Sequence, residues 1–222
     1  MGSAAGMSTQ LDRRSRKRLA TRQAISNAAT RLFIERGFDK VTVDQIADAA
    51  DVGRMTVFNH FPRKEDMFFD LDEVGRADLT AALERRDPPV APIEALRLFA
   101  HRAVAEEKPY IKFFPGSLRY VETIESSPQL KSRAREIRDE LAQAVAHALA
   151  AAAGRPEDDL DARLAASMLM ATWTTAMTEA HKVFRTSNDA KRAHETLLAI
   201  ADKGCIALTA MLAHTPYTEA AM

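Results

Sequence analysis

The feature that most constrains the fold of this chain is the helical spacing of its apolar residues, which continues through nearly its whole length. From Ala24 to Phe33, for example, apolar residues recur three or four positions apart, the repeat of one face of an α-helix. Helix-favouring Ala, Leu, Arg and Glu dominate, and runs of β-branched residues are absent. The sequence therefore predicts an all-α fold.

Prolines, glycines and capping residues divide this pattern into separate helices. The expected helices span residues 21–36, 43–50, 54–60, 64–86, 93–107, 110–125, 127–153, 156–184 and 189–212. The stretch from Asp87 to Pro92 contains three prolines and is the clearest interruption. We expect a first domain over residues 8–64 and a second over residues 65–222, which begins with a linker helix at 65–86.

Charge is distributed unevenly along the chain, although the formal net charge is zero. Residues 1–64 contain 12 lysines and arginines against 6 aspartates and glutamates, whereas the remainder contains 19 against 25. A basic segment joined to an acidic one indicates an anion-binding module on a body that does not bind anions. Within residues 8–20, the run from Arg13 to Arg18 has few apolar neighbours, which predicts a flexible basic arm.

Residues 42–62 have the pattern of two short helices joined by a three-residue turn. Thr42, followed three positions later by Gln45, is a capping box that starts the first helix. Residues 51–53 supply the turn, and Pro62 prevents the second helix from continuing. The apolar residues of a shared inner face are Ile46, Ala47, Ala50, Val52, Val57 and Phe61. This arrangement is that of a helix-turn-helix DNA-binding unit.

Residues 21–69, with the sequence TRQAISNAATRLFIERGFDKVTVDQIADAADVGRMTVFNHFPRKEDMFF, resemble the N-terminal domain of transcriptional regulators of the TetR family (TetR/AcrR type). The shared pattern has an aromatic–glycine corner, a Thr-Val-x-x-Ile-Ala helix and a recognition helix of the form Thr-x-(Tyr/Phe)-x-His-Phe, followed by Lys-Glu. The resemblance implies an N-terminal three-helix DNA-binding domain, followed by a helical-bundle domain for effector binding and dimerisation.

Three positions depart from the family pattern. Asp51 replaces the usual turn glycine, and Asp tolerates the left-handed conformation better than most residues. Gly53 replaces the usual Ser or Thr cap of the recognition helix and is a weaker cap. Phe58 replaces a Tyr whose hydroxyl commonly touches a phosphate in the family, so that contact is in doubt. None of the three is expected to remove the fold.

The expected DNA contacts divide into those that give affinity and those that read bases. Arg22, Arg54 and Lys64 should neutralise phosphates, together with the backbone amide near Thr42. Base reading is assigned to the recognition helix, where an arginine can discriminate guanine by roughly 1–3 kcal/mol. The predicted DNA-binding residues are Arg22, Thr42, Arg54, Met55, Thr56, Phe58, Asn59, His60 and Lys64. The basic arm either reaches a minor groove or is a solvated tail.

The second domain offers two features beside its helical pattern. In TetR-like proteins the last two long helices form a four-helix dimer interface, and here residues 160–184 and 189–212 mix large with small apolar residues. The alternative is that these faces are intrachain core. A pocket for a small apolar or amphipathic molecule is predicted from soft and aromatic side chains, with ordinary core as the alternative. The predicted pocket residues are Phe99, Phe113, Phe114, Tyr120, Met168, Trp173 and Met177.

No pattern in the sequence indicates an enzyme, a metal site or a cofactor. The HExxH, P-loop and GxSxG patterns are absent, and the six histidines are scattered. The single cysteine, Cys205, cannot form an internal disulfide, which suits a reducing cytoplasm. No apolar run reaches the roughly 18 residues of a membrane-spanning helix.

These observations favour a cytoplasmic, sequence-specific transcriptional regulator. The preferred interpretation is a repressor that binds double-stranded DNA as a homodimer, at a palindromic inverted-repeat operator, and is released by a small apolar or amphipathic ligand. The alternative is a DNA-binding regulator that needs no ligand, or an activator. A preformed apolar pocket would distinguish the first from the second.

Overall fold

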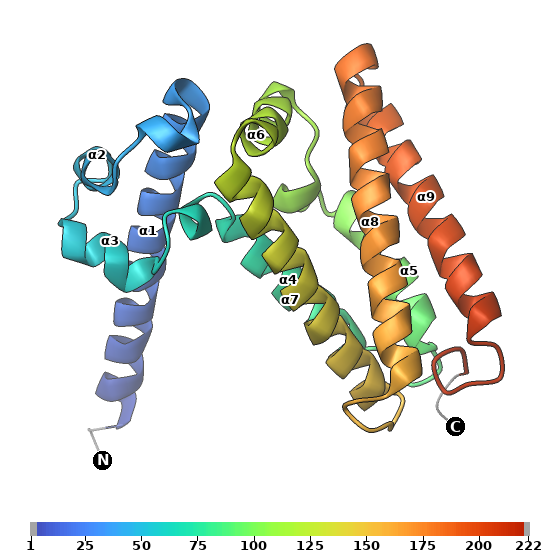
Figure 1. Cartoon of the computed structure of the whole chain (residues 1–222). Helices are drawn as coiled ribbons and strands as arrows, with labels where there is room; N and C mark the ends of the chain where they lie inside the picture. Colours follow the sequence, from blue (N-terminus) through green and yellow to red (C-terminus); the bar gives the residue numbers. More distant parts are fainter. Residues whose placement is uncertain (1–3, 220–222) are drawn as a thin grey trace. The chain divides into compact units, whose positions relative to one another are not determined.

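The computed structural model describes residues 4–219, with side chains from residue 13 onward (Figure 1). The prediction of an all-α fold is confirmed. The α-helices are α1 (Ala4–Arg36), α2 (Val43–Ala49), α3 (Arg54–His60), α4 (Asp70–Glu84), α5 (Pro92–Ala105), α6 (Pro115–Ser126), α7 (Pro128–Ala152), α8 (Leu160–Ser187) and α9 (Ala190–Met211). Short 3-10 helices are η1 (Phe38–Lys40), η2 (Glu65–Met67) and η3 (Pro109–Ile111).

The chain divides into two compact units. The first runs up to Asp70 and also includes Glu122–Arg133, whereas the second contains Leu71–Val121 and the residues from Ala134 onward. Among the described residues, none of the helices combines the length and apolarity that crossing a membrane would require.

The expectation of a flexible basic arm is wrong, because α1 begins at Ala4 and includes residues 8–20. The side chains from Arg13 to Ala20 are exposed, so packing does not hold this segment in a helix. Its composition provides the reason, since Arg, Lys, Leu and Ala are good helix formers and no proline or glycine interrupts residues 8–36. The basic side chains therefore project from a continuous helix.

The core of the first unit is formed by the apolar faces of α1, α2 and α3. Ile25, Phe33, Ile46 and Val57 are fully buried, as the helical spacing predicts. Gly37, with a φ of 86°, ends α1, and Phe38 packs its ring 4.9 Å from that of Phe33.

The expected linker helix over residues 64–86 is interrupted. Residues 65–67 form η2, and α4 begins only at Asp70. The cause is the run Met67, Phe68 and Phe69, in which all three side chains are buried. Three consecutive residues of an α-helix point over about 200°, wider than one buried stripe, so the backbone departs from a regular helix to bury them all.

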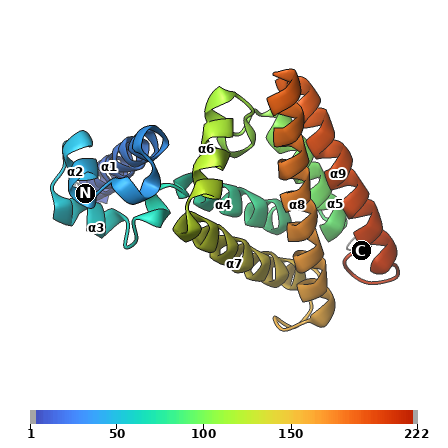
Figure 2. The same ribbon diagram turned by 45° about the horizontal axis from the view of Figure 1, so that its top comes forward.

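The second unit is built from long helices, of which α8 and α9 lie side by side in both views (Figure 1 and Figure 2). One core cluster includes Leu83, Ile93, Leu149 and Leu208. A second cluster lies around Phe113, Ala176, Phe184, Ala193 and Leu197. Gly204 of α9 lies directly against Thr172 of α8, so these two helices approach closely.

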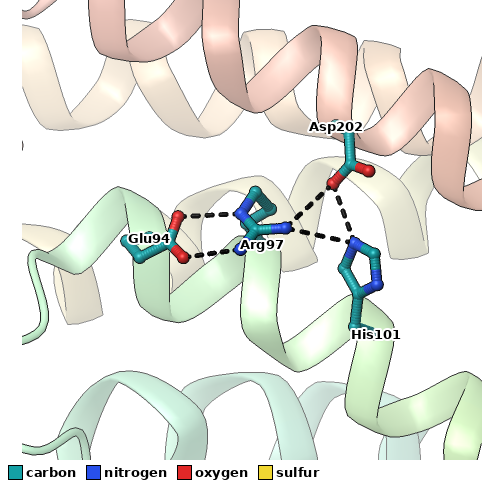
Figure 3. Close-up of polar contacts among 4 residues, drawn as sticks. All are labelled: Glu94, Arg97, His101 and Asp202. Carbon is teal, nitrogen blue, oxygen red and sulfur yellow. Dashed lines mark hydrogen bonds and ion pairs between the residues drawn. The ribbon is translucent and has the colours of Figure 1, made fainter.

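A polar cluster joins α5 to α9, and we call Glu94, Arg97, His101 and Asp202 the α5–α9 cluster (Figure 3). Arg97 binds both carboxylate oxygens of Glu94, and His101 Nε2 lies 2.8 Å from Asp202 Oδ1. Burial opposes ionisation of Asp202, but its hydrogen bonds with His101 and Arg97 outweigh this effect and lower its pKa. The cluster thus joins the two helices through charge as well as apolar packing.

Candidate nucleic-acid interface

Helix α3 has one buried face and one exposed face. Val57 is fully buried, whereas Met55 is 71% exposed and Phe58 is 38% exposed. Arg54 and Asn59 are also exposed, and Thr56 and His60 are half-buried. The helix is seven residues long and begins after Gly53, whose lack of a side chain leaves the first turn without a side-chain cap. Six of the predicted DNA-binding residues therefore lie on this one helix.

The turn that positions α3 has the backbone conformation that the sequence predicts. Asp51 has a φ of 53°, in the left-handed region that the usual glycine adopts without strain. Thr42 forms the predicted capping box at the start of α2, since its hydroxyl accepts from Gln45 N and the Gln45 side chain accepts from Thr42 N. The turn and the cap together fix the angle at which α3 leaves α2.

Arg54 forms an ion pair with Asp44 of α2, in which Nη1 donates to both carboxylate oxygens at 2.8 and 3.0 Å. Both side chains are about 60% exposed, so water screens the pair and its stabilisation is small. The Arg54 guanidinium also lies 5.6 Å from the centre of the Phe58 ring. Asp44 therefore orients Arg54 while holding it weakly enough for a nucleic acid to displace the carboxylate.

His60 ends α3 beside arginines of α1. Burial lowers its pKa, and the charges of Arg18 and Arg22 lower it further. Its Nδ1 is buried and has no hydrogen-bond partner among residues 4–219. His60 is therefore neutral at pH 7, and any contact that it makes to DNA is that of a neutral imidazole. The electrostatic effect of Arg18 also places the basic part of α1 close to the end of α3.

Arg22 makes contacts inside the first unit. Its Nε donates to Asp70 at 2.7 Å, its Nη1 donates to the carbonyl of His60 at 2.8 Å, and its guanidinium lies 4.3 Å from the centre of the Phe61 ring. The side chain is 28% exposed. Its predicted role as a phosphate contact stays a prediction, and these contacts add a structural role that sequence reasoning missed.

Lys64 is also engaged within the first unit. Its Nζ donates to the backbone carbonyl of Phe38 at 2.6 Å and lies 4.1 Å from the centre of the Phe38 ring. Burial lowers the pKa of Lys64, against the opposing charges of Asp39 and Glu65. Its predicted phosphate contact likewise stays a prediction. The contact to Phe38 fixes the segment after α3 against the corner after α1.

Two acidic residues of this region were not expected to matter. Asp44 has a detectable signal, because an acid in the first turn of α2 lies where the helix dipole favours it and can pair with a nearby cation. Asp70 has no such signal in the sequence, because its partner Arg22 lies 48 positions away.

The predicted ligand-pocket residues all lie in the second unit, and that they line one pocket stays a prediction. Phe99 lines a pocket between α4 and α5. Met168 packs against the first core cluster of the second unit, and Phe113, Trp173 and Met177 belong to the second. Phe114 is 52% exposed and Tyr120 is half-buried.

Comparison with known proteins identifies the first unit. Residues 25–71 match the description "Bacterial regulatory proteins, tetR family". The chain is 37% identical over 84 residues to the HTH-type transcriptional regulator TcmR of Streptomyces glaucescens, a match that covers 37% of each chain. It is 38% identical over 77 residues to the probable acrEF/envCD operon repressor of Escherichia coli, covering 32% of this chain and 34% of that protein. The matches thus span about a third of these curated relatives.

Similarity of fold extends further along the chain. The solved structure of a SmeT–triclosan complex covers 85% of this chain and 91% of its own, with a TM-score of 0.55 and 21% identity. At that identity the likeness shows a common fold. The helix-turn-helix of residues 42–61 and the family match around it lead to one conclusion, which is that residues 25–71 form a DNA-binding domain like that of the tetR family of bacterial regulatory proteins.

Proposed function

We propose that this protein is a sequence-specific DNA-binding transcriptional regulator that places α3 in the major groove of its operator. The observation that carries the proposal is the exposed face of α3, on which Arg54, Met55 and Asn59 project away from the buried Val57. The family is one of regulators rather than enzymes. Such a protein acts on the bacterial chromosome, which places it in the cytoplasm.

Affinity for the phosphate backbone comes from the basic residues around α3. Arg54 lies at the start of α3. At the end of α3, the basic residues of α1 contribute, since the charge of Arg18 lowers the pKa of His60. Because α1 is helical through this region, the basic residues between Arg13 and Arg18 are distributed around the helix axis. Each phosphate neutralised releases a counterion, so binding falls steeply as salt rises.

Dimerisation is supported by apolar residues left exposed on α8 and α9. These are Leu160, Leu164, Ile206 and Met211, which are 40–73% exposed. Exposed apolar residues on two adjacent long helices are what a face covered by a second copy requires. A two-fold dimer reads a two-fold site, so the operator is an inverted repeat whose half-sites lie about one DNA turn apart.

Release from DNA by a small apolar or amphipathic ligand is the regulatory part of the proposal. It is supported by the aromatic and methionine side chains of the second unit, including Trp173, Met177 and the pocket-lining Phe99. SmeT, which shares the fold, was solved in complex with triclosan. A ligand can release the protein only if it binds the DNA-free conformation more tightly, and a preference of about 1–3 kcal/mol changes operator affinity roughly 5- to 150-fold.

The test is selection of DNA from a random pool by the purified protein, followed by affinity measurements on the enriched site. We expect an inverted repeat. Arg54→Ala should bring the enriched site and a scrambled site closer in affinity by about 1–3 kcal/mol, if Arg54 reads a guanine. Arg192→Ala is the matched control, because Arg192 is an exposed arginine at the start of α9. Failure to enrich any sequence, or equal behaviour of the two variants, would overturn the proposal.

A further inference from the structure

A pocket of about 320 Å³ lies between α4, α5 and the segment that connects them. Its lining residues are Asp78, Ala81, Ala82, Arg85, Arg86, Asp87, Val90, Ala95, Leu98, Phe99, Arg102, Ala103, Glu106 and Lys108. All of them belong to the second unit. The volume lies at the lower end of the range, about 300–1,000 Å³, that small-molecule sites occupy.

The acids at one end of the pocket already have a cation. Lys108 Nζ lies 3.2 Å from Asp78 and 3.3 Å from Glu106. Tyr110 donates a further hydrogen bond to Asp78 at 3.0 Å. Two carboxylates share one ammonium group, so this end of the pocket keeps one net negative charge.

The arginines of the pocket are not compensated in this way. Arg85 and Arg102 are exposed, and neither has an ion pair or a side-chain hydrogen bond among residues 13–219. Arg86 donates through Nη2 to the carbonyl of Ala152 at 2.7 Å, but its Nε is buried and has no acceptor within the described part of the chain. Asp87 is the one further acid of the lining, so the four cations of the lining exceed its three acids by one positive charge.

Apolar side chains form the rest of the wall. Val90, Leu98 and Phe99 are half-buried, which leaves part of each side chain accessible. The alanines of the lining, Ala81, Ala82, Ala95 and Ala103, leave the room that larger side chains would fill. The pocket therefore presents an apolar surface and a set of guanidinium groups to the same small volume.

We propose that this pocket binds a small amphipathic organic anion, with its carboxylate among Arg85, Arg86 and Arg102 and its apolar body against Phe99. Guanidinium groups bind carboxylates through charge-assisted, often bidentate hydrogen bonds. A neutral apolar ligand would instead remove water from the arginines without supplying an acceptor for Arg86 Nε, which costs binding free energy. This inference rests on the ligand-release part of the proposed function, whereas DNA selection tests the DNA-binding part, so the two can fail separately.

The experiment compares naphthylacetate with its neutral isostere naphthylacetamide by isothermal titration calorimetry of the full-length protein. The acid should bind at least about tenfold more tightly than the amide, because only the acid pairs with the arginines. Equal affinities, or no binding of the acid, would overturn the proposal.

Variants locate the site. Arg102→Gln should raise the dissociation constant for naphthylacetate about tenfold and leave that for naphthylacetamide unchanged. Arg102 is exposed, so the variant should fold, and circular dichroism checks this. Arg76→Gln is the matched control, because Arg76 is an exposed arginine on α4 that does not line the pocket. If the two variants bind naphthylacetate equally well, the anion is bound elsewhere and the assignment is wrong.

Discussion

The close approach of α8 and α9 at Gly204 leads to a prediction whose magnitude depends on one neighbouring side chain. A Cβ added at Gly204 would lie 2.9 Å from the Thr172 Cβ and closer still to both γ atoms. Rotation of the Thr172 side chain moves its γ atoms but not its Cβ, so the backbone must shift. Gly204→Ala is therefore an overpacking substitution at a helix contact.

Two effects of opposite sign set the magnitude. Overpacking a well-packed contact costs typically 1–3 kcal/mol. Ala is favoured over Gly inside a helix by about 1 kcal/mol, which offsets part of this cost. Gly204→Ala alone should thus lower the free energy of unfolding by up to roughly 2 kcal/mol. In a Thr172→Ala background the two nearest atoms are gone and only the Cβ contact at 2.9 Å remains, so the same substitution should cost less, within about 1 kcal/mol of neutral.

The assay is urea unfolding of the wild type, both single variants and the double variant. Trp173, the only tryptophan, follows Thr172 on α8 and reports on this helix by its fluorescence. The double-mutant cycle isolates the interaction between positions 172 and 204. If Gly204→Ala stabilises the protein equally in both backgrounds, the two helices do not meet at this point and the reasoning is refuted.

Asp44→Asn should raise affinity for DNA of any sequence at low salt, because Arg54 loses a carboxylate that competes with phosphate; gel-shift titration would show an unchanged affinity if this is wrong. Arg22→Gln should lower the free energy of unfolding by about 2 kcal/mol, since the Asp70 carboxylate loses its guanidinium partner. Hydrogen exchange of the α1 and α3 amides measures this loss, and wild-type protection would contradict it. The pKa of Asp202 is lower in the folded protein than in the unfolded chain, where it is about 3.9. The ionised carboxylate therefore stabilises the fold at a pH above about 3.9, and this stabilisation is lost as the pH falls through the pKa of the folded state. Urea unfolding between pH 7 and about pH 3 should therefore show a smaller acid loss in Asp202→Asn, and identical profiles would exclude this role.

Local features of the helix-turn-helix could be predicted from sequence because their causes lie within a few residues. The bounds of α3 agree with the prediction of 54–60, since the turn before it and Pro62 after it define both ends. The capping box of Thr42 and the positive φ of Asp51 depend on neighbours no more than three positions away. The exposed residues of α3 follow from the helical repeat once Val57 is placed in the core.

Features that depend on distant partners could not be predicted in this way. Lys64 and Arg22 have partners 26 and 48 positions away, and no pattern in a single sequence pairs such residues. The late start of α4 depends on the burial of three consecutive side chains, which requires the surrounding core. The helical basic segment was missed for a different reason, because charge was given more weight than helix propensity.

The contacts of Arg22 have a mechanical consequence. The Arg22 guanidinium donates to the carbonyl of His60, the last residue of α3, and to the carboxylate of Asp70, the first residue of α4. The backbone of Arg22 belongs to α1. Three helices therefore meet at a single planar group. If α4 turns about its axis, Asp70 moves with it, and the guanidinium must either follow, pulling on the end of α3, or break a charge-assisted hydrogen bond. Within the first unit, a displacement of Asp70 therefore acts on the end of α3 through one side chain.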